Sequence, residues 1–365
     1  MRRTPPLIIG GGPAGAAAAI RLAKAGSGST IIERQAIAGD PLCGGFLSWQ
    51  TLEALETLGL SGDELQGHEV HTLRIFAGRR IYELPLPAPA RGVSRGRLDS
   101  LLLAKAETLG VVVRRGIAIS EYRTETGELR FDDGGILTPE SLFLATGKHD
   151  LRGLPRPRHA AGNDPMLGLR FRLPASNTLI DILSGHIEMH LFNGGYLGIV
   201  VQEGAIANLC MAVRKSRLGV AQTRPAALFA ELAQDSPALA ERLAGMPAAS
   251  HIDAIGRVPY GWRARTTQPG IFRLGDQAGV ITSLAGEGIG IALASARCAV
   301  EYWRDGGSAA ASAYQRAFAR QLRRPLAIAE LLGSVGRHPD IAALPLALLA
   351  AIPGATTMIA RATRV

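Results

Sequence analysis

The sequence predicts an α/β fold with three parts: a Rossmann-type parallel sheet, a separate antiparallel sheet and a helical C-terminal tail. Residues 7–33 follow the order strand, glycine-rich turn, helix, strand, which is the unit from which parallel sheets are built. Between residues 166 and 213, apolar and polar residues alternate with a period of two, which is typical of antiparallel strands with one buried face. Residues 309–365 show mostly helical spacing.

The first strand–helix–strand unit can be placed to within a few residues. Residues 7–9 are a short apolar run, as expected of a strand buried on both faces. The alanine-rich residues 14–24 predict a helix, which Gly26 would end. Residues 30–33 predict the second strand, and the crossover helix makes the two strands parallel neighbours.

The same patterns locate the remaining elements. Further helices are expected over residues 49–60, 97–109, 224–245 and 288–302. Further strands are expected over residues 72–76, 80–84, 111–113, 141–145 and 271–274. A hairpin is expected over residues 128–131 and 136–138, around the Asp-Asp-Gly-Gly turn at 132–135. Prolines are expected to end or break elements at Pro85, Pro87, Pro89, Pro325, Pro345 and Pro353.

The first motif that carries chemistry is Gly10-Gly11-Gly12-Pro13-Ala14-Gly15, a GxGxxG that lies between a strand and a helix. Its first glycine permits a tight turn, its second lets the backbone approach a pyrophosphate, and its third lets helix and strand pack closely. The helix start that follows offers free N–H groups to phosphate charge. Glu33, at the end of the second strand, can accept a hydrogen bond from a ribose hydroxyl and would repel the 2′-phosphate of NADP. The motif therefore predicts a dinucleotide site.

A second glycine-rich motif lies more than two hundred residues further along the chain. Gly275-Asp276 follows a predicted strand, so that the carboxylate can hold a polyol or ribose hydroxyl. Leu284-Ala285-Gly286-Glu287-Gly288-Ile289 then opens a helix, whose N–H groups can stabilise negative charge on a reduced flavin ring. We predict that the two motifs are halves of one site.

These motifs resemble the FAD-dependent superfamily of aromatic hydroxylases and geranylgeranyl reductases. The resemblance rests on the GxGxxG, Glu33-Arg34, Arg95-Gly96-Arg97-Leu98-Asp99 and Gly275-Asp276. Cys43-Gly44-Gly45 and residues 275–289 are most similar to the geranylgeranyl-reductase-related branch. Residues 145–153 resemble a stretch in bacterial flavoprotein monooxygenases of polyketide pathways, a form of secondary metabolism. The resemblance covers about residues 7–300 and is specific for FAD and for the fold, but not for the substrate.

The resemblance implies roles for individual residues. The adenosine half of FAD would be held by Gly10, Gly12, Pro13, Ala14, Gly15, Glu33 and Arg34. The flavin half would be held by Cys43, Gly44, Gly45, Arg95, Ala145, Gly147, Gly275, Asp276, Gly286, Gly288 and Ile289. In this assignment Arg95 and Asp276 contact the ribityl and phosphate region, and residues 286–289 face the isoalloxazine ring. No catalytic side chain is assigned, because the flavin carries the difficult chemistry.

The resemblance also implies a division into domains. A discontinuous FAD-binding domain would comprise residues 1–70, 95–165 and 255–308. A substrate domain built on the antiparallel sheet would comprise residues 71–94 and 166–254, and residues 309–365 would form a C-terminal helical segment.

Three functions are compatible with these motifs. The first is an NAD(P)H-dependent monooxygenase that hydroxylates an aromatic, polyketide or lipid-like small molecule through a flavin C4a-hydroperoxide. The second is a flavin-dependent reductase of C=C bonds in an isoprenoid chain, and the third is an electron-transfer flavoprotein. The tryptophan motif of flavin halogenases is absent from the sequence, which argues against that activity.

The composition of the chain indicates which binding partners and which cellular compartment to expect. The chain has 365 residues and a formal charge of +9, but its arginines are scattered, so we do not expect nucleic acid as a partner. Its cysteines, Cys43, Cys210 and Cys298, form no CxxC pair, so neither a disulfide framework nor a zinc site is expected. With no signal-like or spanning apolar stretch, the sequence indicates a cytoplasmic protein; it does not indicate an oligomeric state.

Several polar and apolar positions leave alternatives open. Period two places His186, Glu188 and His190 on one face of a strand, either as a solvated outer face, which we favour, or as a polar wall over the flavin. Arg170 and Arg172 share this ambiguity. We expect Cys210 in the core and a packing or backbone role for Cys43. Residues 342–351 predict a core helix, although peripheral membrane contact or a cover over a hydrophobic substrate would also suit them.

Overall fold

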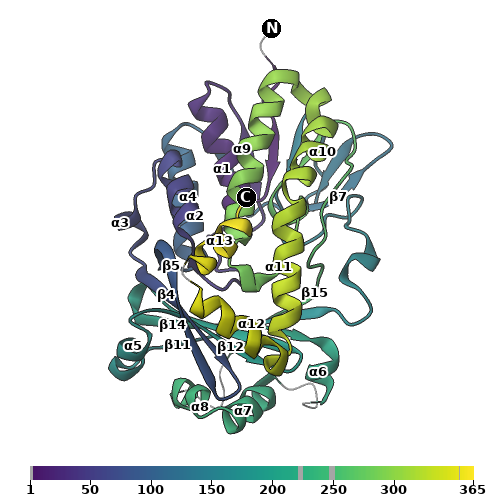
Figure 1. The fold of residues 1–365 in the computed structure, drawn as a ribbon. Helices are drawn as coiled ribbons and strands as arrows, with labels where there is room; N and C mark the ends of the chain where they lie inside the picture. The colour runs from purple at the N-terminus through teal and green to yellow at the C-terminus, as the bar shows by residue number, and fades with distance from the viewer. Residues whose placement is uncertain (1–2, 221–224, 246–250, 353) are drawn as a thin grey trace.

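A five-stranded parallel sheet organises the first part of the computed structural model, which describes residues 3–220, 225–245, 251–352 and 354–365 (Figure 1). In spatial order its strands are β16 (Ile271–Arg273), β10 (Leu142–Leu144), β1 (Leu7–Ile9), β2 (Thr30–Glu33) and β6 (Val112–Arg115). Strands β1, β10 and β16 are buried throughout, as their continuous apolar runs predict. The Rossmann-type parallel sheet expected from the sequence is confirmed.

Helices α1 (Pro13–Lys24) and α4 (Arg95–Thr108) pack on this sheet, and α9 (Gly288–Gly306) packs on α1. Two further helices join them: α2 (Trp49–Leu58) contacts α9, and α3 (Gly62–Leu65) contacts α4. The four alanines 16–19 of α1 are fully buried, and their small side chains let α1 pack directly against α9 (Figure 1). This contact brings together two helices that are remote in the sequence.

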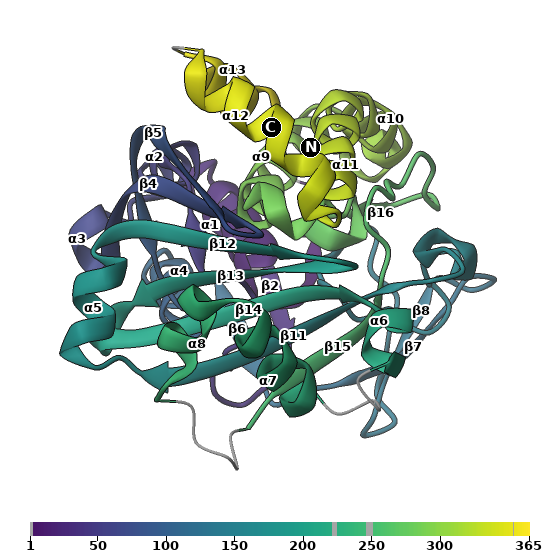
Figure 2. The same ribbon diagram turned by 60° about the horizontal axis from the view of Figure 1, so that its bottom comes forward.

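An eight-stranded sheet forms the second part of the molecule (Figure 2). In spatial order its strands are β15 (Asp253–Val258), β11 (Met166–Pro174), β14 (Ile206–Arg214), β13 (Gly195–Gln202), β12 (Gly185–Phe192), β4 (His68–Ala77), β5 (Arg80–Gly92) and β3 (Phe46–Leu47). All neighbours are antiparallel except β12 and β4. The predicted alternation over residues 166–213 thus corresponds to four real strands.

Both faces of this sheet are covered, which corrects the expectation of a single buried face. On one face, Phe171 and Leu209 pack against Phe229 and other apolar residues of α7 (Pro225–Asp235) and α8 (Pro237–Leu243). The remaining helices of this part are α5 (Asn177–Leu183) and α6 (Lys215–Val220).

Residues 224–245 were expected to form one helix, but the structure has two, α7 and α8. Ser236 separates them and caps α8 by accepting a hydrogen bond from the Leu239 N–H. Arg224 lies outside the described residues.

Strand β5 continues through three prolines that were expected to end it. Its pairing with β4 shifts between Val70 and Thr72, so residues 86–89 have no register partner in β4 among the described residues. Its pairing with β3 begins only at Arg91. The missing N–H groups of Pro87 and Pro89 therefore interrupt no hydrogen-bond ladder, which is the setting in which strands tolerate proline.

The predicted hairpin is present as β8 (Glu128–Phe131) and β9 (Ile136–Leu137), which form a small sheet with β7 (Ile119–Arg123).

The C-terminal segment is helical, as predicted, and crosses both sheets (Figure 1). It comprises α10 (Ala311–Gln321), α11 (Arg323–Gly336), α12 (Pro339–Ala351) and α13 (Ala355–Ala362). The break expected near Pro325 is present: α10 ends at Gln321, and Pro325 lies in the first turn of α11, where its N–H would have no helical partner. The break expected at Pro345 is absent, because α12 continues through this residue. Pro353 lies outside the described residues. No single helix of the described residues is long and apolar enough to cross a membrane; α12 and α13, bent by 115°, reach that length and hydropathy only together.

Candidate cofactor and substrate site

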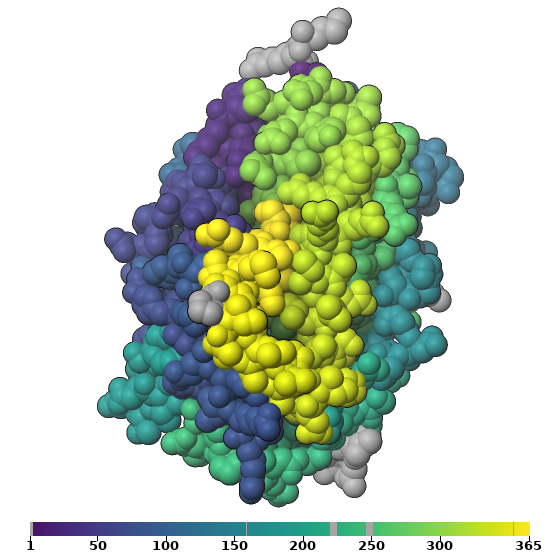
Figure 3. Space-filling model, viewed as in Figure 1, coloured from purple at the N-terminus to yellow at the C-terminus, as the bar shows by residue number. Residues whose placement is uncertain are grey.

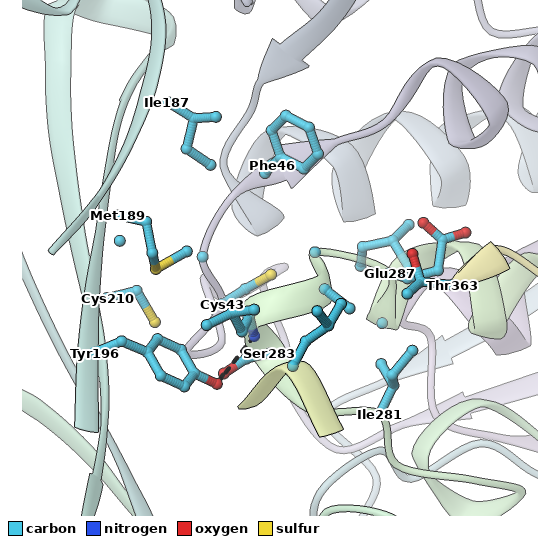
Figure 4. A pocket seen from close by; sticks show the side chains of 18 of the residues that line it. Cys43, Phe46, Ile187, Met189, Tyr196, Cys210, Ile281, Ser283, Glu287 and Thr363 are labelled. Carbon is cyan, nitrogen blue, oxygen red and sulfur yellow. Dashed lines mark hydrogen bonds between the residues drawn. The ribbon is translucent and has the colours of Figure 1, made fainter. Parts of the chain in front are cut away.

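A cavity of about 670 Å³ lies where the starts of α1 and α9 meet the eight-stranded sheet and the C-terminal helices. Figure 4 shows Cys43 and Phe46 on one side and Met189 and Cys210 on the sheet side, with Glu287 at the far end. Segments separated by more than two hundred residues therefore share one cavity. Each of the two glycine motifs contributes residues to its wall.

Steric constraints explain the glycines of the first motif. Gly10 has a φ of +100°, and a Cβ there would lie 2.4 Å from the carbonyl oxygen of Ala145. A Cβ at Gly15 would lie 1.9 Å from the carbonyl oxygen of Gly10, so no side chain fits between α1 and β1. The carboxylate of Glu33 accepts hydrogen bonds from the backbone N–H groups of Gly11, at 2.7 Å, and Gln35, at 2.9 Å. These contacts fix the turn and bring Glu33 next to the start of α1.

At the carboxyl ends of β10 and β16, a lysine and an aspartate form an ion pair. Lys148 Nζ lies 3.2 Å from Asp276 Oδ2, and the charge of Asp276 raises the pKa of Lys148. Both residues line the cavity. Because β10 and β16 are parallel neighbours, the residues that follow them reach the same edge of the sheet, where α/β proteins bind ligands.

Arg95 reaches the cavity on the other side, at the start of α4. Its Nε and Nη2 donate to the two carboxylate oxygens of Asp99 at 2.8 and 2.6 Å. Burial raises the pKa of Asp99 and opposes its ionisation, while Arg95 opposes that shift. The bidentate pair fixes the guanidinium plane, so that Asp99 acts as a positioning residue for Arg95.

The Cys43–Gly45 loop is held against the sheet by one side chain. Asn208, on β14, donates from Nδ2 to the carbonyl oxygens of Cys43, at 3.1 Å, and Gly44, at 2.8 Å. Gly45 has a φ of +71°, and a Cβ there would lie 1.9 Å from Gln202 Nε2. The loop therefore lies against the cavity wall in a conformation that only glycine satisfies at position 45.

Most of the residues predicted from the sequence line this cavity. They are Gly12, Pro13, Ala14, Cys43, Gly44, Gly45, Arg95, Ala145, Gly147, Gly275, Asp276, Gly286, Gly288 and Ile289. Gly10 and Gly15 lie behind the wall in the turn, Glu33 contacts Gly11, and Arg34 does not line the cavity. Lys148 and Asp99 were not assigned to the site from the sequence, although Asp99 belongs to the motif that begins at Arg95. The position of Lys148 after a strand end and the i,i+4 spacing of Asp99 from Arg95 are the signals that indicate them.

Comparison with known proteins identifies the cofactor as FAD. Residues 3–134 match the FAD binding domain family. The chain is an FAD-dependent oxidoreductase. This flavoprotein is 24% identical over 328 residues to the menaquinone reductase of Mycolicibacterium smegmatis, an alignment that covers 84% of this chain and 77% of that protein.

PqsL and CmlS are among the solved structures that share its fold. PqsL from Pseudomonas aeruginosa, described as “a probable FAD-dependent monooxygenase”, matches with a TM-score of 0.72 at 16% identity, over 93% of this chain and 98% of that chain. CmlS, a flavin-dependent halogenase, matches with a TM-score of 0.74 at 19% identity, over 100% of this chain and 74% of that chain. At these identities the likeness concerns the fold alone.

The cavity of the flavoprotein suits the charge distribution of FAD. Neither α1 nor α9 has a side-chain hydrogen bond at its N-cap, so the first N–H groups of both helices remain available to a ligand. The start of α1 would hold the pyrophosphate, with Arg95 as a cation nearby. The start of α9, at Gly288 and Ile289, would favour negative charge on the ring. A Cβ at Gly288 would meet no atom within 4 Å, which leaves space for a ligand there.

The polar face of β12 in the flavoprotein is neither solvated, as we favoured, nor directed at the cavity. Glu188 is fully buried on the side that α8 covers, and accepts hydrogen bonds from Arg242 at 2.8 and 2.9 Å and from Arg74 at 3.0 Å. His190 is buried beside it, 3.2 Å from Glu188 Oε2, and stacks on Phe76. The opposite residues, Ile187, Met189 and Leu191, line the cavity. The alternation along β12 assigned each residue to the correct face of the strand. Whether a face is buried under a helix or lines the cavity was set by the position of α8.

Arg170 and Arg172 are anchored differently from one another. Arg170 is buried and its Nη2 lies 2.6 Å from Asp253 Oδ2, while it also donates to the backbone carbonyls of Asp40 and Pro41. Arg172 is more exposed and pairs with Asp40. Both therefore hold the segment that precedes Cys43. Neither lines the cavity.

Cys210 lines the cavity instead of packing in the core. It faces the same space as Cys43 (Figure 4), and burial raises the pKa of its thiol to about 12. The thiol is therefore protonated at neutral pH and is a poor nucleophile. Cys210 lies on β14, but the expectation of a core position was wrong because its side chain faces the cavity.

A buried ion pair connects the α9 start of the flavoprotein to the end of the chain. Arg364 Nη1 lies 2.7 Å from Glu287 Oε2 and also donates to the carbonyl oxygen of Ala285 at 2.7 Å. The Arg364 guanidinium carbon lies 4.9 Å from the ring centroid of Trp49. Burial raises the pKa of Glu287 to about 7, although Arg364 opposes that shift. The pair holds the C-terminal segment against the turn that precedes α9 at the cavity wall, and no sequence pattern indicated it.

The raised pKa of Glu287 predicts a pH-dependent stability. The folded protein binds the Glu287 proton more tightly than the unfolded chain does, in which glutamates have a pKa of about 4.3. The stabilising free energy from this protonation is therefore fully present below about pH 4.3. It is lost as the pH rises through about 7. We expect Glu287→Gln to gain about 3 kcal/mol of unfolding free energy relative to wild type between pH 4.5 and pH 8. Urea unfolding at several pH values measures this, with Glu56→Gln as a control substitution at an exposed position. An equal difference between Glu287→Gln and wild type at all pH values would contradict the prediction.

Proposed function

We propose that this flavoprotein is an NAD(P)H-dependent monooxygenase that hydroxylates an electron-rich ring bearing a long hydrophobic chain. The observation that carries the proposal is the contrast between the two ends of the cavity. The helix starts, Arg95, Lys148 and Asp276 line one end. Aliphatic side chains from β4, β12 and α12, such as Ile75, Met189 and Leu349, line the other.

The residues that line the cavity would bind the substrate and stabilise charge beside the cofactor. The chemistry that FAD supplies when bound is electron transfer from NAD(P)H and the activation of oxygen. The aliphatic wall would bind the hydrophobic chain and exclude water from the reacting carbon. The α9 start would stabilise negative charge beside it.

A small polar group interrupts the aliphatic wall. Tyr196 accepts a hydrogen bond from the Leu284 N–H at 2.9 Å, and its hydroxyl lies 2.7 Å from Ser283 Oγ (Figure 4). Tyr260 contacts the same Ser283 at 2.9 Å. Burial raises the pKa of both phenols, so they remain protonated. This group would bind the polar head of a substrate and orient its ring.

An oxygen-labelling experiment tests the proposal. Purified holoprotein is incubated with NADH or NADPH and a long-chain alkylphenol under ¹⁸O₂. We expect substrate-stimulated oxidation of the nicotinamide and one ¹⁸O atom in the hydroxylated product. Label that enters from water instead of oxygen would contradict a monooxygenase.

A second candidate is a reductase of isoprenoid C=C bonds. It is favoured by the similarity to the menaquinone reductase and by the aliphatic cavity, which suits a prenyl chain as well as an alkyl chain. Anaerobic turnover of a prenylated quinone, with a mass gain of two hydrogens, would support this candidate and oppose the first.

A further inference from the structure

Helix α12 is apolar on all of its sides. Between residues 339 and 360 the only charged side chain is that of Asp340. One face of α12 lines the cavity through Ala342, Leu346 and Leu349. A helix that is apolar all round is expected to be buried on all sides, and this one is not.

The other face of α12 is exposed to solvent. Ile341, Leu344 and Leu348 are 55–68% exposed and lie on one side of the helix at spacings of three and four residues. Ile352, which follows the last residue of α12 in an extended conformation, is 56% exposed. Leu348 and Ile352 also contact the cavity, so the exposed side continues into its lining. Met358, on α13, is 68% exposed. We call these five residues the outer apolar face. They are five of the twelve exposed large apolar residues in the described part of the chain, so they form a cluster and not a random scatter.

Basic residues lie beside the outer apolar face. Tyr82 of β5 donates a hydrogen bond to the carbonyl oxygen of Ala343 at 2.9 Å, which fixes the tip of the β4–β5 hairpin against α12. Arg79 and Arg80 are exposed at this tip, and Ile81 is exposed beside them. Arg361 is exposed on α13. The acidic residues here are Asp340 and Glu83, of which Glu83 is paired with Arg74 at 2.8 Å.

An opening lies between the helices that carry this face. Figure 3 shows a hollow between α11 and the segment formed by α12 and α13. Val335 on α11, Leu346 on α12 and Ile359 on α13 line the cavity beneath these helices. An apolar surface therefore borders an apolar cavity.

We propose that the outer apolar face docks on a lipid bilayer with anionic headgroups, so that a hydrophobic substrate passes from the bilayer into the cavity between α11 and α12. An apolar helix face flanked by arginines is the arrangement that binds at a bilayer interface. A two-fold pairing of this face with a second copy of the chain would bring like-charged arginines towards one another, which favours the lipid. The inference concerns docking and does not depend on which reaction the flavin performs.

Vesicle flotation of the FAD-loaded protein tests the proposal. We expect the protein to float with vesicles that contain phosphatidylglycerol, and to float at least tenfold less with vesicles of phosphatidylcholine alone. Leu344→Asp combined with Leu348→Asp should reduce the bound fraction at least tenfold. Arg79→Glu combined with Arg80→Glu should weaken binding and reduce its dependence on salt.

A matched control separates docking from misfolding. Ile136 is 54% exposed on β9, away from the C-terminal helices, so Ile136→Asp should leave vesicle binding unchanged. Flavin content and the melting temperature confirm that each variant is folded. Equal flotation of wild type and the Leu344/Leu348 variant would overturn the proposal. A dimer in sedimentation that the same variant dissociates, with no vesicle binding by wild type, would assign the face to a second copy.

Discussion

Replacing Glu188 with glutamine is expected to lower the free energy of unfolding by about 3 kcal/mol. Glu188 is fully buried and contacts Arg74 and Arg242, whose positive charges would lose their partner. Breaking one side of a buried ion pair typically costs about 3–5 kcal/mol, because the remaining charge stays away from water. The glutamine amide keeps part of the hydrogen bonding, which places the expected cost at the lower end. Equilibrium unfolding in urea measures the difference.

Glu83 provides a matched control for this prediction. It pairs with the same Arg74 at 2.8 Å, but its side chain is 55% exposed. Glu83→Gln should therefore cost less than about 1 kcal/mol. If both variants lose the same stability, burial is not the cause and the argument for Glu188 is wrong.

The stability that Glu188 contributes depends on pH in the opposite direction to the stability that Glu287 contributes. Burial opposes ionisation of Glu188, but the hydrogen bonds from His190 and Arg242 outweigh it and hold the pKa at about 2. The contribution is therefore complete above the unfolded value of about 4.3 and is lost as the pH falls towards 2. We expect wild type to lose about 3 kcal/mol more than Glu188→Gln across this range. Parallel acid-unfolding curves for the two proteins would contradict the prediction.

Replacing Gly12 with aspartate is expected to weaken FAD binding by about 100-fold or more. Gly12 precedes α1 with a φ of −71°, which any residue can adopt, so the fold should survive. A Cβ there would lie 3.1 Å from Arg95 Nη2, and the added carboxylate would occupy the position expected for the pyrophosphate. Two like charges about 4 Å apart repel by about 4 kcal/mol near a protein surface, which is ample for this loss. Flavin fluorescence titration of the apoprotein gives the affinity.

Gly28→Asp is the control for the Gly12 variant. Gly28 is exposed beyond the other end of α1, and its nearest neighbour would be Pro5 at 3.8 Å, so the same side chain is added without a clash. It should bind FAD as wild type does. A Gly12 variant with wild-type affinity would mean that the pyrophosphate does not lie at the start of α1.

Local features of the chain were predictable because their causes are local. The GxGxxG turn is specified by Gly10 and Gly15, where a Cβ would collide with backbone only a few residues away or on the adjoining strand. Strands β1 and β2 have the predicted bounds, and both glycine motifs contribute to one cavity. Continuous apolar runs and glycine spacing carry this information directly in the sequence.

Tertiary packing decided what local patterns leave open. Alternation along β12 separated Glu188 from Met189, but only the placement of α8 made the polar face a buried ion network and the apolar face a cavity wall. Arg364 meets Glu287 because the C-terminal helices return across the molecule, and no short-range spacing encodes that path. By itself the sequence determined where the backbone must turn and which residues share a strand face. Whether a face meets solvent, a helix or a cavity depends on long-range contacts, because burial is a property of the assembled fold and not of the strand.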